Sequence, residues 1–255
     1  VVRIAGADVG QGHHTVMGQI VAETLGIDFE RVTLETSDTA FTESSGSASA
    51  SRLTFMAGNA VRQAAQAAQQ KWQSEDRPAI AEATYLAPKT TPLDPKTGYS
   101  LPNFAYGYVA QMAEVTVDTE TGFITVDYVV CADDVGKAIN PDQIVGQIEG
   151  AVVQAHGYAL LEDFRTEKGQ VLTSNFSTYL IPGVYDIPKR VDSIIVEDPH
   201  PEGPFGVRGM AEMPYLPYAA VVASAVFDAT GVWFDEFPLT PERVLRRLGK
   251  VRRRL

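Results

Sequence analysis

The chain has 255 residues, of which 45% are hydrophobic, so it is long enough to bury a core in one large domain or two small ones. Its formal net charge of -11 argues against a nucleic-acid-binding surface, which needs basic side chains to neutralise phosphates. A single cysteine, Cys131, excludes an internal disulfide and any cysteine-rich iron–sulfur or zinc site. Its strand-like surroundings predict a small buried apolar residue.

Neither a membrane-spanning segment nor a secretory signal is recognisable in the sequence. No apolar stretch approaches the roughly 20 residues that cross a bilayer, so we expect a cytoplasmic protein that binds no membrane. The sequence starts without Met in the strand-like residues 1–4, which we interpret as a processed or split chain whose sheet partners lie elsewhere. The basic run at residues 246–254 is expected to form a solvated C-terminal tail.

The first 72 residues alternate between strand and helix patterns. Residues 1–7 predict a short strand that runs into a glycine turn, and apolar side chains recur at helical spacing over residues 12–25. A second strand is predicted at residues 32–36. Residues 37–50, rich in Ser, Thr, Ala and Gly, predict a loop, and residues 51–72 predict a long helix.

The middle of the chain starts with a long irregular segment. Residues 73–106 are dense in Pro, Thr, Asp and Gly, and they predict an ordered connection that is functional or covered by a partner. The segments 114–118 and 123–131 then alternate apolar and polar residues around a turn and predict a β-hairpin. Asn140 as cap and Pro141 as first helical residue predict the start of a helix.

The last part of the chain contains two strand patterns, near residues 170–175 and 191–197, and an apolar helix pattern at residues 215–229. No internal repeat is present. Strands and helices that alternate with an antiparallel hairpin predict an α+β fold.

The first candidate site is the turn Gly10-Gln11-Gly12, just before the first predicted helix. A helix N-terminus presents unpaired N–H groups and favours an anion, the glycines permit close approach, and Gln11 offers both a donor and an acceptor. The turn lacks the Lys-Ser/Thr pair of a nucleotide P-loop and the third glycine of a dinucleotide fingerprint. Because adjacent residues on a helix point about 100° apart, we interpret His13 and His14 as polar groups at the helix start rather than metal ligands.

Two further segments combine small or amide side chains with a predicted helix. The run Ser45–Arg52 places hydroxyl groups at the start of the helix at residues 51–72, and the alternative interpretation is an ordinary serine-capped loop. In the helix that follows Pro141, Gln147 and Gln154 share one face, which is either a ligand-binding or a solvent-exposed face.

The segment Gly203–Pro214 places one carboxylate, Glu212, in a loop crowded with glycine and proline. Glycine permits positive φ or close backbone approach and proline stiffens the path, so such a loop can hold Glu212 against a ligand with little freedom left to lose. For an isolated residue, a surface glutamate in a connecting turn is the alternative.

Taken together, these segments resemble the molybdenum-binding part of the molybdenum hydroxylase (xanthine oxidase) family. The resemblance extends along almost the whole chain and rests on four segments in the family's order, Gly6–Thr15, Ser45–Arg52, Gly146–Gln154 and Gly203–Pro214. It implies that residues 1–255 form the C-terminal half of the family's molybdopterin-binding region, with mixed sheets packed against helices. This region is one body or two subdomains with an irregular connection near residues 73–106.

The resemblance also implies which residues contact the cofactor. They are Gly10, Gln11, Gly12, Ser49, Ala50, Ser51, Arg52 and Gln147. The serine segment would bind the pterin and its phosphate, Arg52 would face the dinucleotide tail as a charge-assisted donor, and Gln147 would hydrogen-bond the cofactor. Proteins of the family give the metal no direct ligand, so no metal-ligating residue is expected here.

Glu212 matches the family's catalytic glutamate. The resemblance implies that it acts as general base on a water-derived oxygen, which is transferred to an N-heteroaromatic (purine-like) or aldehyde substrate. A positioned base of this kind typically contributes about 10²–10⁴-fold in rate. The family segment reads Gly-Val-Gly-Glu-Pro, whereas here Ala211 replaces a glycine and Met213 a proline, so the substrate pocket is expected to differ.

The implied cofactor is a molybdenum-pyranopterin in the form of molybdopterin cytosine dinucleotide. The implied partners are a second molybdenum-binding chain or N-terminal half, an iron–sulfur subunit with 2Fe-2S clusters and a flavoprotein subunit with FAD. One alternative is a non-catalytic cofactor scaffold or insertion protein, against which the retained Glu212 argues. Another is a carbon monoxide dehydrogenase-type subunit, whose copper-binding cysteine loop would lie in the missing half.

Overall fold

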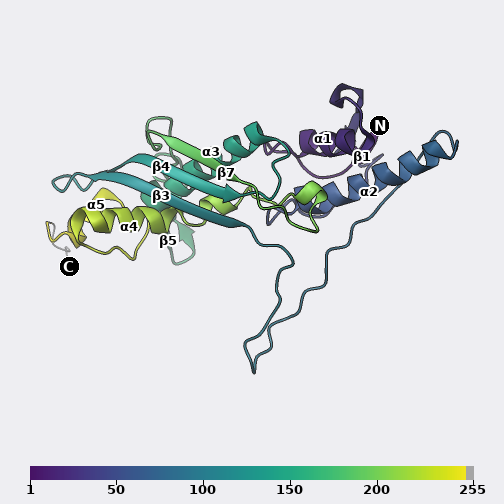
Figure 1. Ribbon diagram of the computed structural model, residues 1–255. Coiled ribbons are helices and arrows are strands. Elements are labelled where there is room, and N and C mark those ends of the chain that lie inside the picture. The colour runs from purple at the N-terminus through teal and green to yellow at the C-terminus, as the bar shows by residue number, and fades with distance from the viewer. Residues whose placement is uncertain (251–255) are drawn as a thin grey trace. The chain divides into compact units, whose positions relative to one another are not determined.

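The computed structural model describes residues 1–250, so residues 251–255, with the end of the basic run, lie outside it (Figure 1). The chain divides into two compact units. The first unit comprises Val1–Tyr108, Asp134–Ile144 and Ile195–Ala211; the second comprises Val109–Asp133, Val145–Ile194 and the residues from Glu212 on. Helices combined with parallel and antiparallel strand pairs confirm the α+β class.

The first unit begins with a strand, a helix and a second strand. Strand β1 (Val2–Ile4) pairs in parallel with β2 (Leu34–Thr36), and helix α1 (His13–Leu25) connects them, followed by the short turn η1 (Phe29–Arg31). The predicted elements are therefore confirmed. Gly26 ends α1 at a φ of 64°, the left-handed conformation that suits glycine after a helix.

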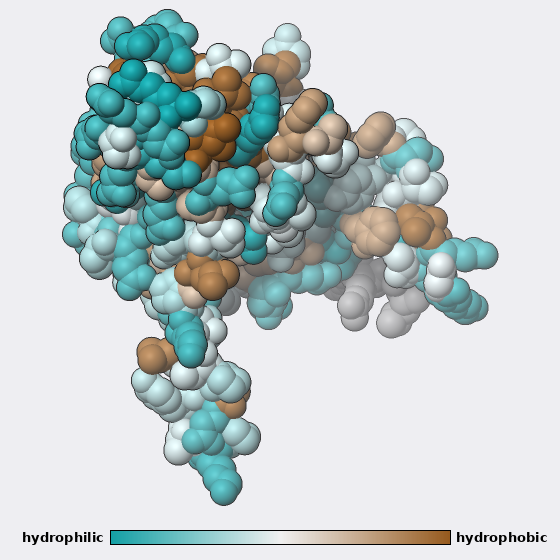
Figure 2. Space-filling model, turned by 90° about the vertical axis from the view of Figure 1, so that its right-hand side faces the viewer, coloured by the Kyte–Doolittle hydropathy of each residue, from teal (hydrophilic) through white to brown (hydrophobic). Residues whose placement is uncertain are grey.

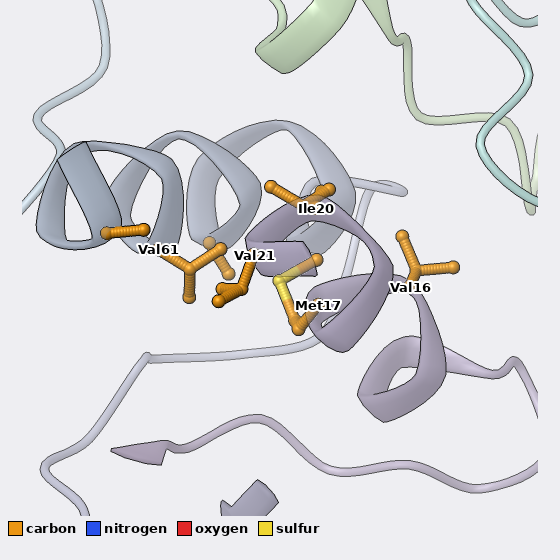
Figure 3. Packing of buried hydrophobic residues seen from close by; sticks show 7 residues of the cluster. Val16, Met17, Ile20, Val21 and Val61 are labelled. Atoms are coloured by element: carbon orange, nitrogen blue, oxygen red, sulfur yellow. The ribbon is translucent and has the colours of Figure 1, made fainter. Parts of the chain in front are cut away.

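Helix α2 (Leu53–Gln73) packs along α1, and the core of the first unit lies between the two helices. Burying an aliphatic side chain of this kind contributes roughly 1.5–3 kcal/mol. The packed side chains are Val16, Met17, Ile20 and Val21 from α1 and Val61 from α2 (Figure 3). This helix pair therefore fixes the positions of the two loops that precede α1 and α2.

Residues 74–107, here called the arm, cover the segment predicted as an irregular connection and contain neither helix nor strand. Figure 1 shows the arm as a long open loop, and Figure 2 shows isolated hydrophobic side chains among hydrophilic ones along it. Leu86, for example, is 81% exposed. At the turn of the arm the Asp94 N–H donates to the Tyr99 carbonyl at 2.9 Å, and the Asp94 carboxylate accepts from the Lys96 N–H at 2.8 Å. Local hydrogen bonds therefore shape the turn of the arm, whereas Tyr85 and Phe104 nearer its two ends pack on Phe55 of α2.

A three-stranded sheet in the order β3-β4-β7 contains the predicted hairpin. Its strands are β3 (Tyr108–Val117), β4 (Ile124–Asp134) and β7 (Val191–Val196). The hairpin strands are longer than predicted. Gln111 lies on the inward face of β3, and Asp133 is fully buried in β4. These polar residues interrupt the alternation of apolar and polar residues on which the strand prediction was based, so the predicted strands were too short.

Helix α3 (Pro141–His156) starts where predicted, because the Asn140 side-chain oxygen accepts a hydrogen bond from the Gln143 N–H at 3.1 Å. A π-helical turn, η2 (Gly157–Leu161), follows it directly. Such turns are rare, and the periodicity of the sequence did not predict this one.

Helix α4 (Tyr218–Thr230) begins later than the predicted residue 215. The short turn η4 (Met213–Tyr215) and Pro217 precede it, and a proline is favoured only at the first turn of a helix. Buried side chains link α4 to α3, with the hydroxyl oxygen of Tyr218 2.8 Å from Nδ1 of His156. Burial lowers the pKa of His156 below its ordinary value.

Three short elements complete the second unit. Helix α5 (Pro241–Arg247) was not predicted, although Thr240 before it is a recognisable cap that accepts from the Arg243 N–H at 3.4 Å. The strand predicted near residues 170–175 is only β6 (Gln170–Val171), an exposed strand that pairs with β5 (Thr166–Glu167). Across residues 1–250, no helix has the length and apolar character needed to span a bilayer.

Candidate functional site

The glycine turn before α1 is organised by the carboxylate of Asp8. One oxygen accepts from the N–H groups of Gly10 at 3.0 Å and Gly12 at 3.3 Å, and the other accepts from the N–H of His14 at 3.1 Å. Burial alone would raise the pKa of Asp8, but these backbone N–H groups hold it below its ordinary value. The N–H groups that were predicted to attract an anion are therefore already paired with an anion of the chain itself.

The predicted binding residue Gln11 is also engaged within this turn. Its side-chain oxygen accepts from the Val9 N–H at 2.7 Å, and its amide nitrogen donates to the Ala7 carbonyl at 2.6 Å. Gly10 is the open position of the turn, with a φ of 111° and no atom of residues 1–250 within 4 Å of the place where a Cβ would stand. A ligand would therefore meet the backbone at Gly10, while Gln11 keeps the turn in shape.

Gly12 faces a residue that was not predicted to belong to the site. A Cβ at Gly12 would stand 2.4 Å from the side chain of Gln143, in the first turn of α3. Gln143 is half-buried, and its Oε1 is buried without a hydrogen-bond partner among residues 1–250. The predicted residue Gln147 lies one helical turn further along α3 and is also half-buried, whereas Gln154 is exposed.

The two histidines at the start of α1 differ in surroundings. His13 is 3% exposed, and burial lowers its pKa. The ring of His14 is half-buried beside the Gly6 carbonyl, at 3.0 Å from Nε2. Among residues 1–250, His, Cys, Asp and Glu side chains form no group of three or more that could hold a metal ion.

The serine loop before α2 has a strained backbone. Ala50 and Ser51 adopt φ values of 54° and 51°, each of which costs roughly 1–2 kcal/mol for a residue with a side chain. The Arg52 Nη2 donates to the Ser45 carbonyl at 2.8 Å, and its Nε is buried without a partner in the described chain. Ser49 and Ala50 are exposed. Since residues 44–54 contain no acidic side chain, the loop offers hydroxyl groups and one guanidinium to a ligand.

The segment Gly203–Gly209 lies against the serine loop and α2 within the first unit. A Cβ at Gly209 would stand 1.7 Å from the Ser51 carbonyl oxygen, so the two backbones are in direct contact. The side chain of Asn59 in α2 donates to the Glu202 carbonyl at 2.9 Å, and the short turn η3 (Pro204–Gly206) packs on Gly58. The structure thus joins two segments that are more than 150 residues apart in the sequence.

Glu212 follows this segment and belongs to the second unit. Its side chain is exposed, whereas Met213 and Pro214 behind it are buried. Within the first unit, Ser51 contacts Gly209 and Gly12 contacts Gln143. Gln147 and Glu212 belong to the second unit. Asp8 was not identified from the sequence as part of the turn. An Asp whose side chain accepts from the N–H two residues later, here that of Gly10, is a common turn signal.

Comparison with known proteins gives consistent matches along the chain. The family described as molybdopterin cofactor-binding domain matches residues 1–84 and 67–188. A probable hypoxanthine oxidase of Escherichia coli is 30% identical over 279 residues, which cover 98% of this chain and 29% of that protein. The 6-hydroxypseudooxynicotine dehydrogenase complex subunit gamma of Paenarthrobacter nicotinovorans is 32% identical over 283 residues, covering 96% of this chain and 36% of that protein.

A solved structure of the aldehyde oxidoreductase from Desulfovibrio gigas superposes with a TM-score of 0.85 at 32% identity. The superposition covers 94% of this chain and 28% of that one. The chain therefore spans about a third of the length of the relatives that it matches.

Proposed function

Because the chain belongs to the molybdenum hydroxylase family and carries that family's molybdopterin cofactor-binding domain, we propose that it supplies the cofactor-binding and catalytic C-terminal part of a hydroxylase. The proposed substrate is an N-heteroaromatic compound of the purine kind or an aldehyde. Relatives named for hypoxanthine and for aldehydes support these two classes.

The residues present fit a pterin with a phosphate tail. The serine loop provides hydroxyl groups and the guanidinium of Arg52, whose Nε is buried without a partner among residues 1–250, and these groups suit a phosphate. The open backbone at Gly10 suits the approach of a flat ring. We propose that Ser49, Ala50, Ser51 and Arg52 hold the phosphate end, and that Gly10, Gly12 and Gln147 line the pterin. Gln11 would act indirectly, by keeping the turn in shape.

One observation carries the proposal, namely the contact between Gly209 and the Ser51 carbonyl. Glu212 follows Gly209 by three residues, and three residues reach at most about 10 Å. The chain therefore tethers Glu212 to the segment that contacts the serine loop. A Glu carried by a segment that touches the proposed cofactor-binding loop is suited to act on the reaction centre.

When bound, the molybdenum cofactor supplies the redox chemistry for hydroxylation with water-derived oxygen. Glu212 accepts the proton that this oxygen loses, which is the work of a general base and typically contributes about 10²–10⁴-fold. The buried residues Met213 and Pro214 fix the backbone on one side of Glu212 while its side chain stays accessible. Arg52 and the serine hydroxyls orient the cofactor and take no part in proton transfer.

The remainder of the enzyme is proposed to lie outside this chain. A partner chain or N-terminal half would complete the molybdenum site, and iron–sulfur and FAD-containing subunits would remove the electrons. One relative is named as a subunit of a dehydrogenase complex, and this name supports a hetero-oligomer. Molybdopterin cytosine dinucleotide is the proposed form of the cofactor.

Replacement of Glu212 by Gln in the purified complex tests the proposed function. We expect Glu212→Gln to retain molybdenum and to lose about 10²–10⁴-fold in kcat with hypoxanthine, nicotinate or benzaldehyde and an electron-accepting dye. Glu202→Gln, an exposed glutamate four residues before the loop's Gly206, is the matched control and should behave like the wild type. Near-normal turnover in Glu212→Gln would refute the role of Glu212. A wild-type complex that holds molybdenum but oxidises none of these substrates would favour a scaffold.

A further inference from the structure

Within the second unit, a side chain from β3 holds the turn that follows Glu212. The Nε2 of Gln111 donates to the Pro214 carbonyl at 2.5 Å, and the same nitrogen lies 3.0 Å from the sulfur of Cys131 in the neighbouring strand. Pro214 is buried and Gln111 is half-buried. A hydrogen bond therefore ties the backbone two residues after Glu212 to the central sheet.

The sequence of the turn explains why its carbonyl depends on a side chain. Leu216 and Pro217 have helical dihedral angles, and the Leu216 N–H donates to the Met213 carbonyl. In this helical path the Pro214 carbonyl would next accept from the N–H at position 217, but a proline has none. The amide of Gln111 stands in for that missing backbone donor.

The orientation of the Gln111 amide is fixed in turn by two buried groups. The Cys131 thiol donates to the Asp133 carboxyl at 3.0 Å, so its sulfur is free to accept from Gln111. Burial, followed by the contact with Asp133, raises the pKa of Cys131 to about 12, and burial raises the pKa of Asp133. The thiol therefore stays protonated across the working pH range. Cys131 is buried as predicted, but it is a hydrogen-bonded group rather than a purely apolar one.

We propose that Gln111 is a positioning residue that sets the place of Glu212 through the Pro214 carbonyl, with Cys131 and Asp133 aligning its amide. This inference rests on the proposed function, in which Glu212 is the base. Gln111 does not touch the reacting atoms. Its effect is on the backbone from which the base projects, and a displacement of about 1 Å in such a group can reduce turnover by roughly 10²-fold.

The test compares variants of the purified complex. Gln111→Leu removes the donor, and Gln111→Met removes it while keeping a side chain of similar length. Pro217→Ala restores a backbone N–H at the position from which the Pro214 carbonyl can be reached. Glu114→Gln, an exposed substitution on the same strand, is the control. The measurements are kcat and KM, molybdenum content, and hydrogen exchange of the peptide that covers residues 212–218.

We expect both Gln111 variants to keep their molybdenum and to lose roughly 10- to 100-fold in kcat, with KM changed less than twofold. The backbone amide hydrogens of residues 212–218 should exchange several-fold faster. Gln111→Leu combined with Pro217→Ala should recover most of the turnover and of the exchange protection. A residue that only fills space would not be rescued by a proline substitution elsewhere. Unchanged exchange in both single variants, or a loss that Pro217→Ala does not repair, would overturn the inference.

The outcome for Glu212→Gln separates this inference from the proposed function. If Glu212→Gln keeps full turnover, the assignment of the base fails whatever Gln111 does. If Glu212→Gln is inactive and the Gln111 variants are normal in turnover and exchange, only the positioning role of Gln111 fails.

Discussion

Substitution of Gly209 by alanine is the most direct perturbation of the contact that joins the serine loop to the segment before Glu212. The added Cβ would stand 1.7 Å from the Ser51 carbonyl oxygen and 2.8 Å from the carbonyl carbon, whereas real contacts at Cβ open to at least 3.0 Å. Both neighbours are backbone atoms, so no side-chain rotation relieves the overlap. The serine loop or the Gly209 segment has to move by more than 1 Å, as the same distances require.

Overpacking of this kind typically costs about 1–3 kcal/mol, so the free energy of unfolding should fall by that amount and the melting temperature by roughly 2–12 °C. Because Ser51 and its neighbours are proposed to hold the cofactor, the molybdenum content of the purified complex should fall as well. Thermal unfolding and metal analysis on the same preparation measure the two effects together.

The matched control is Gly146→Ala in α3. Gly146 is exposed, and no atom of the described part of the chain lies within 4 Å of the place where its Cβ would stand. Alanine should therefore leave the molybdenum content unchanged and stabilise the helix by about 0.5–1 kcal/mol. If Gly209→Ala melts at the wild-type temperature and retains its molybdenum, the contact with Ser51 does not organise the site.

Two further predictions concern stability. Asp8→Ala removes the acceptor of three backbone N–H groups and should lower the free energy of unfolding, measured in urea titrations, by about 1–2 kcal/mol. Asp8→Asn should lose less. Equal stability of the wild type and the two variants would contradict the capping role. The pKa of His156 is lower in the folded than in the unfolded state, so the unfolded chain binds the proton more readily. The contribution of His156 to the free energy of unfolding is therefore complete above about pH 6.5 and is lost as the pH falls from there through the folded pKa. His156→Gln should flatten that acid-side loss in unfolding curves recorded between pH 8 and 5, and an unchanged slope would argue against His156 as its source.

Local signals in the sequence predicted the elements whose causes are themselves local. The left-handed glycine after α1 and the Asn140–Pro141 start of α3 are both short-range effects, and both are confirmed. The hairpin was found but shortened, because Gln111 and Asp133 place polar groups on inward or buried positions. The start of α4 was placed too early, because an apolar pattern does not register that Pro217 cannot donate a hydrogen bond.

The geometry of the candidate site was only partly accessible from the sequence. Residue types and order identified the serine loop and the loop of Glu212, but no local pattern reveals that Gly209 touches Ser51 or that Gln143 lies against Gly12. Such contacts depend on how distant segments pack. The role of Gln11 shows the opposite case, in which a side chain suited to a ligand bonds to its own turn instead.

The interleaving of the two units constrains how the protein is made. The first unit takes its last segment from residues 195–211, so its fold cannot be completed until residue 211 has been synthesised. Contacts that wait for distant partners slow folding and leave apolar surface exposed in the meantime. Neither unit corresponds to one uninterrupted stretch, so no single cut of the gene separates them, and expression of either would require segments to be rejoined by design.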